Sequence, residues 1–96
     1  MLNSKQRAYL RKMANTMNPI FHVGKNGVED EMIKQLDDVL EVRELIKIKI
    51  LKNSFLDAKE AASIICEETG CETVQFIGHT VVLYRESKNK PEIELP

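Results

Sequence analysis

The stretch "FHVGKNGVEDEM" (residues 21–32) marks the point where a strand is expected to pass into a helix. Ile20, Phe21 and Val23 are typical of a short strand over residues 20–23. The loop follows at residues 24–27, and Asn26 is expected to cap the helix, with Glu29 completing a capping box. The stretch therefore predicts a strand-loop-helix unit whose loop is either a plain turn or a ligand-binding loop.

A helix is predicted before this unit. Ser4 is expected to cap it, and Leu10, Met13, Ala14 and Met17 recur at the spacing of one helical face. The Asn-Pro pair at 18–19 ends the helix at about Met17, because a proline disfavours helical geometry in the residue before it.

The segments after the unit predict a second strand and a third helix. In "LIKIKIL" (residues 45–51), isoleucine alternates with lysine, which predicts one buried and one solvent-facing side. Asp57 and Glu60 form a capping-box pair at the start of the third helix. Gly70 is expected to end this helix, since glycine readily takes the left-handed conformation of a helix end.

The last predicted unit is a hairpin, "TVQFIGHTVVLYR" (residues 73–85), with Gly78-His79 as a type II′ turn. The complete order is α-β-α-β-α-β-β. Strands joined through helices are expected to be parallel neighbours, and the last strand is expected to pair antiparallel with the third. This predicts one α/β (α+β) domain over residues 1–96, a mixed four-stranded sheet with three helices, with an extended tail at residues 86–96.

Charge is nearly balanced overall but unevenly distributed. The 96 residues carry a net charge of −1, which argues against non-specific coating of nucleic acid. Residues 1–28 hold five basic residues and no acid, whereas residues 29–44 hold seven acids and two basic residues. Two cysteines, Cys66 and Cys71, are expected to be free thiols in a reducing compartment. Without an apparent secretion signal or membrane span, the expected location is the cytoplasm.

The chemistry of the Gly24–Gly27 loop favours an anion but does not require one. Glycines allow close approach of another backbone, and the following helix start and Lys25 add positive charge. The loop lacks the P-loop and Rossmann patterns, and a lone G-x-x-G is a weak signal. The acids at 29–31 oppose a phosphate there. On pattern alone a plain turn is favoured, although the loop has a KH-like position, and KH loops clamp a nucleic-acid backbone.

Three motifs in order make the chain resemble the YhbY-type CRM (chloroplast RNA splicing and ribosome maturation) domain. They are "LNSKQRAYLRKMANTMNPIFHVGKNGV" (2–28), "ELIKIKIL" (44–51) and "VQFIGHTVVLYR" (74–85), and the likeness extends to the final "IELP". The resemblance implies a fold similar to the C-terminal domain of the third bacterial initiation factor. It also implies an RNA-binding protein that associates with large-subunit precursors of the ribosome.

Carried onto this sequence, the resemblance implies an RNA-contacting loop of Gly24, Lys25, Asn26 and Gly27. The candidate basic residues around it are Arg7, Arg11, Lys12, Lys49, Lys52 and Arg85. The expected partner is large-subunit ribosomal RNA, with ribosomal proteins as further partners, and we expect a monomer that does not bind membranes.

An alternative function is a protein-interaction adaptor. In that hypothesis the acidic second helix binds a basic ribosomal protein through Asp37, Asp38 and Glu41. An enzyme is not expected, because no nucleophile, base and orienting group form a recognisable set. No cofactor or metal site is expected either, since the spacing of His22, His79 and the two cysteines matches no zinc pattern.

Overall fold

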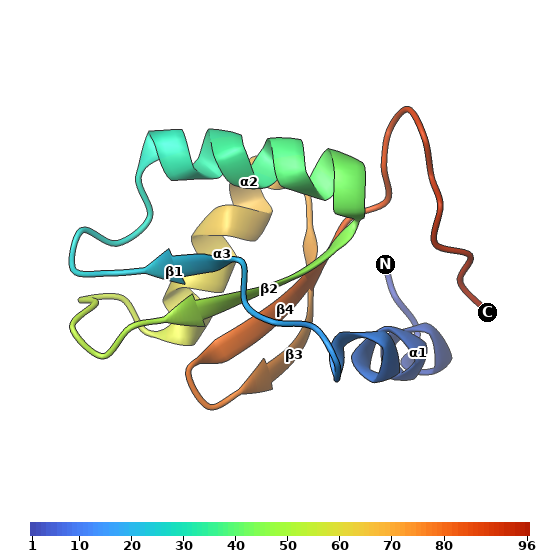
Figure 1. Ribbon diagram of the computed structural model, residues 1–96, viewed down its shortest axis with the longest axis horizontal. Helices are drawn as coiled ribbons and strands as arrows, with labels where there is room; N and C mark the ends of the chain where they lie inside the picture. The colour runs from blue at the N-terminus through green and yellow to red at the C-terminus, as the bar shows by residue number, and fades with distance from the viewer.

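A computed structural model describes residues 1–96 and contains the seven predicted elements in the predicted order. The helices are α1 (Ser4–Ala14), α2 (Asp30–Arg43) and α3 (Ala58–Thr69), and the strands are β1 (Phe21–Val23), β2 (Leu45–Ile50), β3 (Glu72–Ile77) and β4 (Thr80–Tyr84). The strands form one mixed four-stranded sheet, which confirms the predicted fold class (Figure 1).

The order of the strands across the sheet is β1-β2-β4-β3. β1 is parallel to β2, and β4 pairs antiparallel with β3, as predicted. The expectation that β2 and β3 are parallel neighbours is wrong, because β4 lies between them and pairs antiparallel with β2. Three successive β4 residues, Val81, Val82 and Leu83, are fully buried, and only a central strand with both faces covered can bury such a run.

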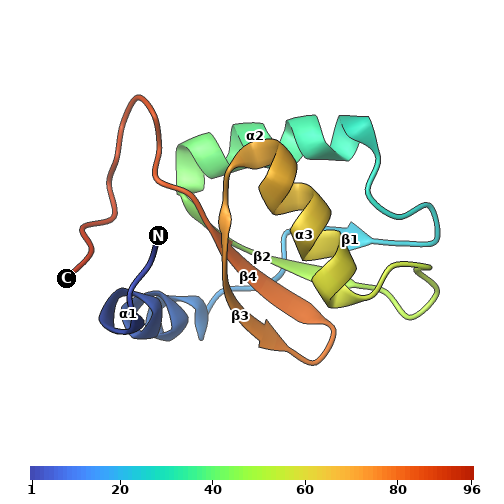
Figure 2. The ribbon, with the colours of Figure 1, turned by 180° about the vertical axis from the view of Figure 1, so that it is seen from behind.

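Helices cover both faces of the sheet. Ile46, Ile48 and Ile50 of β2 lie in the larger core, which α2 and α3 complete. Residues on the opposite face, among them Leu45 and Val82, pack with Leu10 and Ala14 of α1 in a second core. Figures 1 and 2 show α1 apart from α2 and α3, near both chain termini.

The predicted helix starts are right for α3 and wrong for α1 and α2. Asp57 and Glu60 form the expected capping box, and Gly70 has the left-handed φ of 79°. Asn3, not Ser4, caps α1 in a box with Gln6, and α1 ends at Ala14. Together with the start of α2, these differences move three helix ends by one to three residues and leave the fold class unchanged.

The expected box of Asn26 and Glu29 does not form. Glu29 itself occupies the cap position of α2, and its side chain makes no capping hydrogen bond. Val28 and Glu29 therefore separate the loop from the first helical residue, Asp30. The predicted apolar face of α2 is nonetheless present, since Leu36 and Leu40 are buried and Val28, Met32 and Val39 pack against the core.

The tail has no helix or strand but is held against the domain. The side chain of Glu44 accepts hydrogen bonds from the backbone N–H groups of Ser87, Glu92 and Ile93 at 2.7–2.9 Å. Ile93 and Leu95 also pack on the second core. The tail is therefore fixed at several points along its length.

Candidate nucleic-acid interface

The Gly24–Gly27 loop is a tight turn with free donors at its corner. The N–H of Gly27 donates to the carbonyl of Gly24 at 3.0 Å, which places Lys25 and Asn26 at the two corner positions. Both corner residues are exposed, and neither backbone N–H donates to another group of the chain. The turn thus presents two unpaired N–H groups beside a lysine, a combination suited to a phosphate oxygen.

The two glycines have different structural roles. Gly27 has a φ of 68°, and a Cβ built on it would lie 2.8 and 2.9 Å from two ring carbons of Phe55. At Gly24 φ is not in the left-handed region, and the nearest atom to a built Cβ is Leu51 Cδ1 at 3.8 Å. The fold therefore favours glycine at position 27, whereas position 24 has room for a side chain.

Three connections meet at the end of the molecule that carries this turn. The connector between β2 and α3 (51–57) contacts the turn through Phe55, whose ring lies beside Gly27. Leu51 N also donates to the carbonyl of Val23, the residue before the turn, at 2.8 Å. The hairpin turn joins them, since Ile50 N donates to His79 O at 2.7 Å. We call residues 24–27, 51–57 and 78–79 the loop end, which lies opposite α1 (Figures 1 and 2).

Three of the predicted basic residues lie at or beside the loop end. Lys25 and Lys52 are exposed in its loops, and exposed Lys49 lies on β2 opposite His22 of β1, one residue before Val23. Lys47 does not belong to this surface. It is only 8% exposed, because it lies opposite Val82 on the sheet face that α1 covers, so the expected solvent-facing side of β2 is wrong at this position.

The basic residues of α1 form a separate patch. Arg11 and Lys12 are exposed in the last turn of α1, at the end of the molecule away from the turn (Figure 1). Arg7 is half-buried, and its guanidinium donates to the carbonyl of Thr73 on β3. The predicted site residues of α1 are therefore not brought together with Lys25, Lys49 and Lys52.

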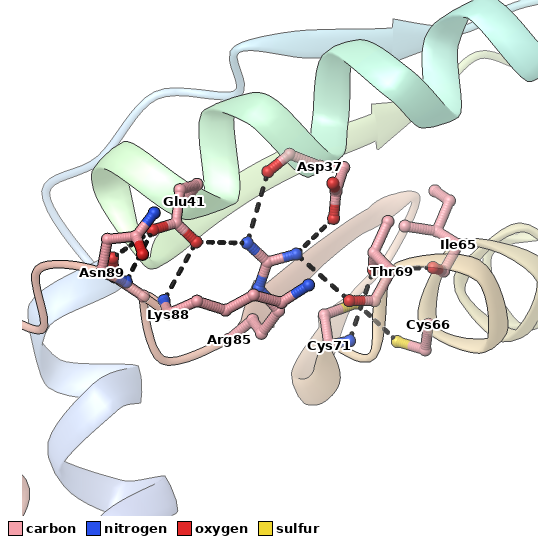
Figure 3. Close-up of polar contacts among 10 residues, drawn as sticks. Asp37, Glu41, Ile65, Cys66, Thr69, Cys71, Arg85, Lys88 and Asn89 are labelled. Carbon is pink, nitrogen blue, oxygen red and sulfur yellow. Dashed lines mark hydrogen bonds and ion pairs between the residues drawn. The ribbon is translucent and has the colours of Figure 1, made fainter.

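Arg85 lies inside the fold instead of on the predicted surface. It is 8% exposed and forms ion pairs with Asp37 and, at 3.0 Å, with Glu41, both on α2. It also donates to the carbonyl of Thr69 at 3.2 Å (Figure 3). With its charge balanced by two carboxylates, Arg85 joins β4, α2 and α3, and we exclude it from the candidate interface.

The same ion pairs involve two of the three residues of the adaptor hypothesis. Besides Arg85, Glu41 binds the tail, accepting from the N–H groups of Lys88 and Asn89 at 3.0 Å and from the Ser87 hydroxyl at 2.7 Å (Figure 3). The N–H of Lys88, with these other donors, lowers the pKa of Glu41 to about 2. Asp38 alone of the three is exposed without a partner.

Glu44 is a buried carboxylate in the same region. Burial raises its pKa, but the three N–H groups of Ser87, Ile93 and Glu92 outweigh this effect, and the net pKa is lowered. The carboxylates of Glu41 and Glu44, at the end of α2, are therefore ionised and accept hydrogen bonds from the tail.

Two of the three acids that follow the turn, Asp30 and Glu31, belong to α2. Asp30 and Glu31 line a groove between α2 and α3 that also contains Asp37 and Glu68. They occupy the first turn of α2, where they offset the positive end of the helix dipole. The turn, and not the start of α2, is therefore the place for an anion.

The two cysteines are free and adjacent. Cys66 Sγ lies 2.9 Å from Cys71 Sγ (Figure 3). The hydrogen bond between them lowers the pKa of Cys66 and raises that of Cys71, and burial raises the pKa of Cys71 further. No helix of the structure is both long enough and apolar enough to cross a membrane.

Two loop-end residues are missing from the sequence-based candidates. Phe55 is 72% exposed, and His79 is exposed in the hairpin turn. The sequence places both in connections but cannot show that those connections meet at the loop end. An aromatic residue in the polar run "KNSFLD" (52–57) is the available signal for Phe55.

The fold and the turn define a small α/β domain that presents a basic, glycine-bounded loop. The chain belongs to the CRS1/YhbY (CRM) domain family, whose model matches residues 2–85. This confirms the resemblance drawn from the sequence motifs.

Two sequence relatives and one solved structure match this chain over nearly its whole length. The chain is 48% identical over 96 residues to the "Probable RNA-binding protein YqeI" of Bacillus subtilis, covering 100% of both chains. It is 34% identical to an "RNA-binding protein" of Haemophilus influenzae, covering 99% of this chain and 95% of the relative. The solution structure of protein SAV1595 from Staphylococcus aureus is 54% identical and superposes with a TM-score of 0.81 over 100% of both chains. The names of the two sequence relatives describe RNA binding and not catalysis.

Proposed function

We propose that this protein binds ribosomal RNA in precursors of the large ribosomal subunit, as a non-catalytic factor in ribosome assembly in the cytoplasm. The observation that carries the proposal is the exposed Lys25-Asn26 corner, with two unpaired N–H groups, in a protein whose relatives are named for RNA binding. Lys49 and Lys52 extend the positive charge beside it.

In this proposal the turn binds one backbone phosphate through the N–H groups of Lys25 and Asn26 and the Lys25 ammonium. Gly24 leaves room for the RNA backbone to approach, since a Cβ built on it would meet only Leu51 Cδ1, at 3.8 Å. Lys49 and Lys52 attract the neighbouring phosphates. The exposed Arg11 and Lys12 on α1 add a second contact for an RNA long enough to reach the far end of the molecule.

The net charge of −1 is compatible with this mode of binding. Most of the acids of α2 either form ion pairs with Arg85 or line the groove that contains Glu68. The net charge of the loop end is therefore more positive than that of the whole chain. Because the contacts are mainly to phosphates, affinity is expected to fall as salt rises.

The test is sedimentation of a tagged copy expressed at native level in a bacterial cell. The protein is expected to travel with large-subunit precursors on a sucrose gradient and not with mature ribosomes. A Lys25→Asp, Asn26→Asp pair is expected to move it to the top. Wild-type protein that stays at the top even in low salt would contradict the proposal.

The chain contains a matched control for this variant. Lys88 and Asn89 repeat the Lys-Asn pair in the tail, and their side chains make no hydrogen bond in the structure. The Lys88→Asp, Asn89→Asp pair changes the net charge equally at a distance from the turn. It is expected to sediment as the wild type does.

A further inference from the structure

Phe55 is the most exposed of the three phenylalanines. Its exposed fraction is 72%, against 40% for Phe76, while Phe21 is packed against the larger core. Single exposed apolar residues are common on protein surfaces, so exposure alone assigns no role. The surroundings of this ring are more specific.

The backbone around Phe55 is fixed. Ser54 N donates to the Leu51 carbonyl at 3.0 Å, and Leu56 N donates to the Ser54 hydroxyl at 3.1 Å. Leu56 packs on the core, and Asp57 begins the capping box of α3. The connector that carries the ring is therefore short and anchored, and its backbone needs little ordering when a ligand binds.

One edge of the ring lies against Gly27, because a Cβ there would come within 2.8 Å of it. The absence of a side chain at position 27 is what makes room for the ring beside the turn. The rest of the ring faces solvent, within the part of the surface that carries Lys25 and Lys52. An aromatic surface beside positively charged groups is the arrangement by which proteins hold single-stranded nucleic acid.

We propose that Phe55 stacks on an unpaired base of the RNA whose phosphate lies on the Gly24–Gly27 turn. This inference rests on the proposed function and narrows it, since a base inside a continuous duplex cannot reach the ring. The site therefore takes a single-stranded loop, bulge or end. The lysines favour RNA over a protein partner as the occupant of this aromatic surface, because an apolar protein patch would gain nothing from them.

A tryptophan reporter tests stacking directly. The chain has no tryptophan, so Phe55→Trp introduces a single one at the site. Short oligouridine is expected to quench its fluorescence, and an abasic oligonucleotide of equal length is expected not to. Val42→Trp is the matched control, since Val42 is 76% exposed near the far end of α2 and its tryptophan should not respond.

Affinity measurements complete the test. Phe55→Leu keeps an apolar side chain without a ring face and is expected to weaken binding of oligouridine by about five- to 150-fold. Its affinity for the abasic oligonucleotide should equal that of the wild type. Circular dichroism and urea unfolding check that the variant is folded.

The outcomes separate this inference from the proposed function. Unquenched Phe55→Trp and wild-type affinity in Phe55→Leu, with binding lost in the Lys25→Asp, Asn26→Asp pair, would overturn stacking. That result would leave RNA binding in place and point to a protein contact for Phe55. A wild-type chain that binds no RNA would overturn both.

Discussion

Replacing each glycine of the turn by alanine should separate the needs of the fold from those of binding. Gly27 has a φ of 68°, a conformation that costs an L-residue about 1–2 kcal/mol. The approach of a Cβ to Phe55 adds little, since the ring is 72% exposed and can rotate away. Gly27→Ala is therefore expected to lower the free energy of unfolding by about 1–2 kcal/mol and Tm by about 4–16 °C.

Gly24→Ala should leave stability within about 0.5 kcal/mol of the wild type, because its φ is ordinary and the nearest atom lies at 3.8 Å. Its RNA affinity should nonetheless fall, since the new methyl group occupies the approach to the turn. The two variants thus separate the two effects: Gly27→Ala should lose stability, and Gly24→Ala should lose only RNA affinity.

Urea unfolding followed by circular dichroism measures the stabilities of the RNA-free proteins. Gly27→Asn is the control, because asparagine tolerates the left-handed conformation and should cost less than alanine. Adding Phe55→Ala should change the cost of Gly27→Ala by less than about 0.5 kcal/mol if the backbone dominates. Equal losses in Gly24→Ala and Gly27→Ala would refute this account of the turn.

Three further predictions concern the interior. Arg85→Met should lower stability by about 1.5–3 kcal/mol in urea unfolding, because charged hydrogen bonds to α2 are lost, without a specific loss of RNA affinity. Glu41 has a folded pKa of about 2 against 4.5, so its contribution is complete above pH 4.5 and is lost as the pH falls toward 2. Glu41→Gln should reduce stability at neutral pH and flatten this part of a stability-against-pH curve. Hydrogen peroxide should join Cys66 and Cys71 in a disulfide, with two waters formed per pair. Intact mass should fall by two hydrogens, and Cys71→Ser should block the change.

Local signals in the sequence were sufficient for the elements. The alternation of Ile46, Ile48 and Ile50 and the Asp57–Glu60 box act within a few residues, and both appear in the structure as predicted. The hairpin turn is also correct, since Gly78 alone of its two residues has a positive φ, 58°.

Apart from the shifted ends of α1 and α2, the errors involve contacts between distant segments. The place of β4 depends on both faces of the sheet being covered, which no single segment encodes. Arg85 reads as a surface charge at a strand end because its partners, Asp37 and Glu41, lie 48 and 44 residues away. Lys47 shares an alternating pattern with Lys49, and only the packing of α1 separates the two.

The candidate site was only partly predicted, because it too depends on contacts between distant segments. The glycine-bounded loop is a local motif, whereas the meeting of three connections at the loop end is a property of the fold. Phe55 could not be recognised until Gly27 was seen beneath its ring.

The most direct measurement is binding of in vitro transcribed large-subunit RNA to three proteins: the wild type, the Lys25→Asp, Asn26→Asp pair and the Lys88→Asp, Asn89→Asp pair. Filter binding over a series of salt concentrations gives the affinities, and circular dichroism gives the state of folding. The account predicts salt-dependent binding by the wild type and the tail pair, and loss of binding by a folded turn pair. Equal affinities for all three folded proteins would show that the Gly24–Gly27 loop is only a turn.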